Sequence, residues 1–253
     1  MKVRDIAAVI ESFAPLSLQE SYDNAGLIVG RPDDEVHRAL LAVDVTEEVL
    51  AEAMAEGCDM IITHHPIVFH AMKRFNSASQ TERCVEEAIR HGIVLYAAHT
   101  NLDSTPDGMS WRVAQMLGLN NVEVMQQTNA EGAGFGVVGE LSEPEKSEDF
   151  MRRVMDRFDV KALRHSDIVK SEIRKVAICT GAGGSLIDEA RASGADIYLT
   201  ADLRYNDFMR HENAIILADM GHFESEYCAI QILFDILSKK IPIFAVRKSV
   251  CSR

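Results

Sequence analysis

Short, continuous apolar runs alternate with segments that carry helix signals along the first half of the chain. The runs cover residues 39–43, 60–63 and 93–98. Unbroken hydrophobicity of this length is typical of strands that are buried on both faces of a sheet. The segments between them predict helices over 46–56 and 81–91, ended by Gly57 and Gly92. Strand, helix and strand in this order predict βαβ units.

The remaining elements follow from similar signals. Residues 3–13 carry apolar side chains at helical spacing, and residues 27–29 predict a short strand. We predict further helices over 106–117, 146–158 and 224–237, and further strands over 176–180, 214–218 and 241–246. Strands and helices therefore alternate through most of the chain, which predicts the α/β class.

The second half of the chain repeats features of the first. A shift of 137 positions sets Thr63 against Thr200, and five more identities follow. These are Glu52 with Glu189, Ala53 with Ala190, Ala55 with Ala192, Gly57 with Gly194, and Asp59 with Asp196. The order of predicted elements agrees as well, so we infer two similar α/β halves, residues 1–125 and 126–253, related by an internal repeat and forming one compact unit.

One glycine pattern is rejected as a nucleotide motif. Gly134, Gly136 and Gly139 formally match G-x-G-x-x-G. That motif has to open a helix, but residues 140–144, which end in Pro144, follow it here. We expect a strand or hairpin with close backbone packing instead.

Composition narrows the class of protein. The chain has 253 residues, 47% of them hydrophobic, and a net charge of -13. A surface that binds nucleic acid is normally basic, so this charge argues against nucleic acid as a partner. The five scattered cysteines form no C-x-x-C pair, which favours a reducing, cytoplasmic location. Residues 1–13 predict a helix rather than a signal peptide, and no apolar run is long enough to cross a membrane.

The candidate chemistry lies directly after the predicted strands. His64 and His65 follow one strand and precede Pro66, and His99 and His222 follow two others. Asp103 and Glu226 come close behind. Histidine with carboxylate suits zinc, iron or manganese, and carboxylates can also bridge two ions that activate a water. The alternatives are structural histidines with hydrogen bonds, and an i,i+4 pair that stabilises a helix.

Three other features allow two interpretations each. Asp23 and Asn24 can contact a substrate or bond to their own loop. The segment Gly181–Ser185 can cradle a phosphate with its amides or form a plain tight turn. Lys73 and Arg74 can bind a phosphate or be ordinary surface charge.

Six segments occur in a characteristic order: Tyr22–Leu27 (YDNAGL), Thr63–Pro66 (THHP), Ala98–Asp103 (AHTNLD), Cys179–Ser185 (CTGAGGS), Thr200–Tyr205 (TADLRY) and Gly221–Glu226 (GHFESE). Together they resemble the Nif-three-like family, whose members are often labelled GTP cyclohydrolase 1 type 2 homologs. The resemblance covers nearly the whole chain. It implies two related α/β halves with a dinuclear metal site between them, and a toroidal homohexamer. Some members insert a domain between the halves, and we expect none here because the chain is too short.

The resemblance also implies roles for single residues. The metal ligands fall on His64, His65, Asp103, His222 and Glu226. His99 faces the substrate or supports the ligands, and Glu226 or His99 transfers a proton during catalysis. The family pattern is not matched at His70, Val137, Ala201 and Asn206, none of which is a ligand position.

These observations lead to one preferred function and one alternative. The preferred one is a hydrolase with two divalent ions per chain that acts on a nucleotide or another small molecule carrying phosphate. The alternative is a metal-binding regulator, metallochaperone or scaffold without catalytic activity, assembled as a ring. The absence of a recognisable base-binding motif favours this alternative.

Overall fold

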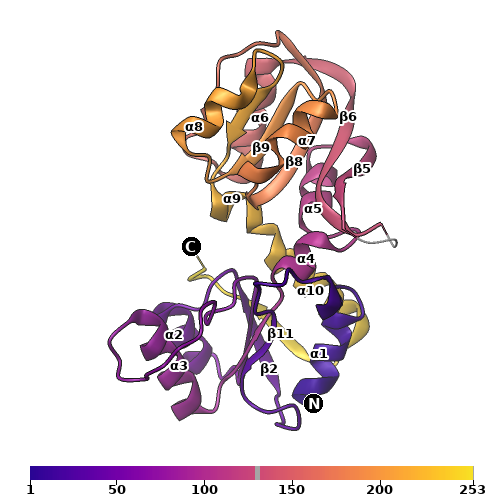
Figure 1. The fold of residues 1–253 in the computed structure, drawn as a ribbon. Coiled ribbons are helices and arrows are strands. Elements are labelled where there is room, and N and C mark those ends of the chain that lie inside the picture. Colours follow the sequence, from indigo (N-terminus) through magenta and orange to yellow (C-terminus); the bar gives the residue numbers. More distant parts are fainter. Residues whose placement is uncertain (129–131, 253) are drawn as a thin grey trace. The chain divides into compact units, whose positions relative to one another are not determined.

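Parallel strands form the centre of a sheet in each of two units (Figure 1). The structure is a computed structural model that describes residues 1–128 and 132–252. Contacts between residues group Met1–Thr105 with Ala229–Arg253 as the first unit, and Pro106–Cys228 as the second. Each unit has its own sheet and its own helices.

The first unit contains a five-stranded sheet in the order β1-β4-β3-β2-β11. Its strands are β1 (Gly26–Val29), β2 (Arg38–Ala42), β3 (Met60–Thr63), β4 (Val94–Ala97) and β11 (Ala245–Lys248). Strands β4, β3, β2 and β11 are parallel, and β1 is antiparallel to β4. The carboxyl ends of the parallel strands therefore meet at one edge of this sheet.

Helices cover both faces of the first sheet, as Figure 1 shows for α2 and α3 on one side and α1 on the other. The helices of this unit are α1 (Val3–Glu11), α2 (Glu47–Ala55), α3 (Gln80–His91), α4 (Thr100–Ser104) and α10 (Cys228–Lys240), with a 3-10 turn at Leu16–Leu18. Leu40, Ile61 and Leu95 of the sheet share one buried cluster with Val49 and Ala88 of α2 and α3. On α1, the Glu11 carboxylate accepts a 3.0 Å hydrogen bond from the Tyr96 hydroxyl.

The second unit contains a six-stranded sheet in the order β5-β6-β8-β9-β10-β7. Its strands are β5 (Asn120–Gln127), β6 (Gly134–Lys146), β7 (Arg164–His165), β8 (Glu172–Ala182), β9 (Ile197–Ala201) and β10 (Ile216–Asp219). Its helices are α5 (Met109–Met116), α6 (Ser147–Phe158), α7 (Ile187–Ala192), α8 (Tyr205–Phe208) and α9 (His222–Glu226), with 3-10 turns at Gly184–Leu186 and Met209–His211. Strands β8, β9 and β10 are parallel, as β2, β3 and β4 are in the first unit.

The α/β class is confirmed, and most of the predicted elements exist. The rejected glycine motif lies within β6, which pairs antiparallel with β5 and β8. Three predictions need correction. The strand predicted over 241–246 begins only at Ala245 and extends to Lys248. The helix predicted over 106–117 begins at Met109, because Asp107 has a left-handed φ of 61° that an α-helix cannot contain. The helix predicted over 224–237 is two helices, α9 and α10. Helices α4 and α8 and strands β5 and β7 were not predicted.

The C-terminal strand pairs with the first unit rather than the second. Strand β11 lies parallel to β2, with Val246 opposite Ala39. Local sequence patterns give no information about such distant partners. The contacts therefore divide the chain at other positions than the predicted halves 1–125 and 126–253. Those halves were defined by the sequence repeat, and that repeat stays a prediction.

Matching hydrogen bonds in the two units support that repeat. The carboxylate of Asp59 accepts from the amides of His37 and Arg38 at 2.9–3.0 Å. Under the 137-residue shift, Asp59 falls on Asp196, which accepts from the amides of Arg174 and Lys175 at 2.9 Å. Each aspartate thus holds the backbone near the start of a parallel strand, β2 in the first unit and β8 in the second.

Among the described residues, no helix has both the length and the apolar character that are needed to cross a membrane.

We predict that Asp59→Ala and Asp196→Ala destabilise the protein by similar amounts. Each substitution leaves two backbone amides without their acceptor, which costs about 1–3 kcal/mol of unfolding free energy. Urea denaturation measures the effect, and Asp33→Ala, at a 66% exposed side chain, is the matched control with little change. Equal stabilities of Asp196→Ala and the control would contradict the assigned role.

The Asp59 contribution should also depend on pH. Burial by itself raises the pKa of Asp59, but the amides of Arg38 and His37 outweigh it and lower that pKa. A carboxyl with a lowered folded-state pKa stabilises the fold above its unfolded-state pKa. The stability difference between wild type and Asp59→Ala should therefore shrink as the pH falls through the folded-state pKa.

Candidate metal centre

The paired histidines converge because strand β3 ends immediately before them. His64 and His65 follow Thr63, whose hydroxyl donates to the His65 carbonyl at 2.8 Å. On a continuing strand the two side chains would point to opposite faces. Here the ring centroids are 5.0 Å apart with planes at 44°. The expected pair is therefore formed at the edge of the sheet.

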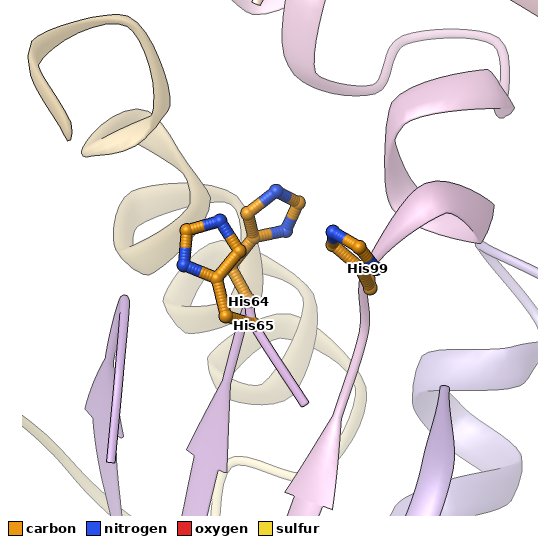
Figure 2. Close-up of side chains that lie close together, drawn as sticks. All are labelled: His64, His65 and His99. Carbon is orange, nitrogen blue, oxygen red and sulfur yellow. The ribbon is translucent and has the colours of Figure 1, made fainter. Parts of the chain in front are cut away.

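His99 joins this pair from the neighbouring strand. Strand β4 is parallel to β3, and the amide of Ala98 donates to the Thr63 carbonyl at 2.9 Å. The His99 ring centroid lies 5.3 Å from that of His64 and 5.5 Å from that of His65. Figure 2 shows the three imidazoles grouped beyond the strand ends. Each offers one nitrogen, and these nitrogens lie within 4.8 Å of one another, so the group could hold a metal ion.

Every imidazole in this cluster has its Nδ1 atom held by an oxygen. His64 Nδ1 lies 2.8 Å from the Ala98 carbonyl, and His65 Nδ1 lies 2.8 Å from Asp44 Oδ1. His99 Nδ1 lies 2.7 Å from Asp23 Oδ1. Carbonyl and carboxylate oxygens accept, so we assign the proton to each Nδ1. That assignment leaves Nε2 of each ring available to bind a metal ion or to exchange a proton, and a held Nδ1 is the usual arrangement around metal-binding histidines.

Helix α4, which begins directly after His99, places Asp103 close to the histidine cluster. Its amide donates to the His99 carbonyl at 3.1 Å, and its Oδ2 lies 3.8 Å from His64 Nε2. The structure thus brings together four of the residues that the sequence singled out: His64, His65, His99 and Asp103.

The second unit brings its own candidate ligands together on helix α9. His222 Nε2 lies 3.0 Å from Glu226 Oε2, and His222 Nδ1 lies 2.7 Å from Asp202 Oδ2. The hydrogen bond to Glu226 raises the pKa of His222 to about 9 against the opposing effect of burial, and Asp202 adds to the rise. With this pKa His222 keeps a proton on Nε2 at neutral pH, and a metal ion bound at Nε2 would replace that proton.

Glycine at position 181 leaves room for the Glu226 carboxylate. Gly181 has a φ of +66°, and a Cβ atom there would lie 2.2 Å from Glu226 Oε1. The amides of Gly181 and Gly183 already donate to Ser225 Oγ and Thr200 Oγ1, at 2.9 and 3.0 Å. These bonds favour a tight turn over a phosphate cradle for the segment Gly181–Ser185.

Sequence reasoning missed two carboxylates that orient imidazoles. Asp44 follows strand β2 and holds His65, and Asp202 follows strand β9 and holds His222. Acids placed directly after apolar strands were the available signal. Asp202 also occupies the position that the repeat sets against His65.

Asp23 makes the loop contact that was one of its two interpretations, and it also makes a contact with His99 that the sequence did not predict. Its Oδ1 accepts from the neighbouring Asn24 amide at 2.7 Å, as expected of a loop residue, and also lies against His99. Burial by itself raises the pKa of Asp23, but hydrogen bonds with His99 and Thr100 lower it to about 2. Asp23 is therefore a carboxylate at neutral pH.

Comparison with known proteins gives a consistent assignment. The sequence model of the Duf34/NIF3 (NGG1p interacting factor 3) family matches residues 1–252. A Clostridium acetobutylicum protein named GTP cyclohydrolase 1 type 2 homolog is 34% identical over 244 residues, which cover 95% of this chain and 90% of the relative.

Solved structures with the same fold agree with the sequence comparison. A Bacillus cereus protein related to NIF3 superposes with a TM-score of 0.91 at 23% identity, covering 99% of this chain and 97% of its own. A Staphylococcus aureus hypothetical protein, SA1388, has a TM-score of 0.91 at 26% identity, covering 100% and 97%. The chain belongs to the Duf34/NIF3 family.

Proposed function

We propose that this protein is a metal-dependent hydrolase of a nucleotide or another small molecule that carries phosphate. Two divalent ions would be held by His64, His65 and Asp103 of the first unit and by His222 and Glu226 of the second. The observation that carries the proposal is the fixed Nδ1 atom of each of these histidines, at 2.7–2.8 Å from an oxygen. Contacts of the same length occur at His37 and His165, which lie outside the cluster, so the support comes from the fixed rings together with the convergence of the His64, His65 and His99 nitrogens within 4.8 Å.

The donor set fits the proposed ions. Imidazole nitrogens and carboxylate oxygens suit zinc, iron and manganese, and no thiolate is among the five groups. When bound, such ions would polarise the substrate and make a water nucleophilic near neutral pH. The number of ions follows the family resemblance.

Proton transfer would fall to groups beside the ions. Asp23 holds His99 at Nδ1, so His99 Nε2 is the atom that takes up or releases a proton, and the Asp23 carboxylate stabilises the charged ring. Glu226 Oε2 is the second candidate. For a GTP substrate, which the names of the curated relatives suggest, the attacked atom would be the imidazole carbon between two nitrogens.

Assembly and location complete the proposal. The family resemblance supports a toroidal homohexamer, and the cysteine pattern supports the cytoplasm. Light scattering of the purified protein measures the assembly directly.

The activity itself can be tested with protein purified without chelators and loaded with zinc, iron or manganese. We expect metal-dependent turnover of GTP or another member of a nucleotide panel, and loss of both metal and turnover in His64→Ala. Protein that retains two ions per chain and turns over no nucleotide would overturn the enzyme proposal. The metal-binding regulator, metallochaperone or scaffold would then be preferred.

Asp44→Ala should weaken metal binding without removing any ligand. Loss of the carboxylate frees the His65 ring to rotate, and such supporting residues are typically worth about 10- to 100-fold in metal affinity. Competition with a chromophoric chelator measures the affinity for zinc. Asp33→Ala is the control with the same charge change, and equal affinities of the two variants would show that Asp44 supports no ligand.

Gly181→Ala should lower metal content by displacing Glu226. The new Cβ would collide with Glu226 Oε1. Gly194→Ala is a matched control, because Gly194 has a similar φ of +75° but nothing within 4 Å of its Cβ position. Both variants lose some stability from the left-handed backbone, whereas only Gly181→Ala should lose metal in elemental analysis. Equal metal contents would count against Glu226 as a ligand.

A further inference from the structure

The loop after the histidine pair lines two adjoining pockets that are open to the surface of the first unit. The larger, of about 520 Å³, is lined by residues 67–74 and by Ser79, Thr81 and Glu82. The smaller, of about 300 Å³, is lined by residues 44–46, 65–67, 80 and 81. Ile67 and Thr81 line both cavities. The two pockets therefore adjoin, the smaller one reaches His65, and each has the size of a small-molecule site.

Two cations line the larger cavity without an anionic partner of their own. Neither Lys73 nor Arg74 forms an ion pair anywhere in residues 1–128 and 132–252. Glu82 is the acid in the lining, and its Oε2 accepts from the amides of Asn76 and Ala78 at 3.1 and 2.8 Å. Glu82 thus holds the loop in shape. Lys73 and Arg74 thus carry positive charge that no acidic side chain of the described residues neutralises, although the whole chain has a net charge of -13.

Other groups of the cavity also favour an anion. Ser79 caps helix α3, and Thr81 lies in its first turn. The first amides of a helix have no intrahelical partner and carry partial positive charge. His70 and the two cations face the same cavity. The lining therefore offers several donors and only one acid.

The loop is attached to the histidine cluster on its other side. The Asn24 side chain donates to the Val68 carbonyl at 2.6 Å. The Phe69 ring lies 6.0 Å from the His99 ring and 6.3 Å from the Tyr22 ring, edge-on to both. Phe69 also lines the larger cavity. Its ring thus touches both the pocket that Lys73 and Arg74 line and the histidine cluster.

We propose that Lys73 and Arg74 bind the phosphate groups of the substrate in this cavity, with Phe69 as the apolar contact that the cavity shares with the histidine cluster. The ligand class is a phosphate ester of nucleotide size. The inference deepens the proposed function by placing one part of the substrate, but binding of the phosphates by these cations does not require catalysis or bound metal.

Equilibrium binding of GTP and of guanosine tests this subsite by calorimetry. The variants are Lys73→Ala with Arg74→Ala, and Lys239→Ala with Lys240→Ala as a control that removes the same charge from exposed positions. Each pair is made in wild type and in His64→Ala, where turnover is expected to be absent. We expect the first pair to weaken GTP binding about tenfold or more in both backgrounds, because charge-assisted hydrogen bonds are lost.

Three further readouts separate this subsite from other effects. Guanosine, which has no phosphate, should bind equally to the first pair and the control, and ATP should show the same loss as GTP. Lys73→Arg with Arg74→Lys should restore most of the binding, which excludes misfolding. GTP affinity that is unchanged in the first pair, or undetectable in wild type, would overturn the proposal. Wild-type protein that binds GTP through these two cations but turns over no nucleotide would overturn only the proposed function.

Discussion

Parallel pairing of β2, β3 and β4 is the constraint on which the histidine cluster depends. The last residues of these strands are paired in register, so Asp44, His65 and His99 each follow a strand end by two residues. Equivalent positions lie side by side at one edge of a parallel sheet. The 2.8 Å contact from Asp44 to His65 and the 5.5 Å separation of the His65 and His99 rings follow from this register. A slip of one strand by one residue would turn its side chain to the opposite face.

The two units share a framework but differ at their strand ends. Asp59 and Asp196 fix the same strand entry in each unit, whereas His65 falls on Asp202 under the proposed repeat. In the first unit this position is His65, whose imidazole contacts Asp44 at the end of the preceding strand β2. In the second unit this position is Asp202, whose carboxylate contacts His222 after the end of the following strand β10. The two units therefore share the hydrogen bonds at the strand entry, but they carry different residue types, an imidazole and a carboxylate, at the equivalent strand end.

Sequence alone predicted the elements whose signals are local, and missed those that depend on distant partners. Continuous apolar runs identified β2, β3 and β4, and with them the histidines that follow β3 and β4. The pairing of β11 with β2 was missed, because nothing near residues 245–248 specifies that partner. Asp44 was missed for a related reason, since an acid after a strand is indistinguishable from surface charge until its histidine is known. Positions after predicted strands singled out Asp103, His222 and Glu226 as candidates, and the family resemblance assigned them as ligands.

A crystal structure of the zinc-loaded protein, with anomalous scattering to locate the ions, tests the central claim most directly. The account predicts zinc at Nε2 of His64 and His65, at about 2.0–2.1 Å, with the Nδ1 atoms still bonded to the Ala98 carbonyl and the Asp44 carboxylate. Zinc bound at Nδ1, or zinc located away from both histidines, would contradict it.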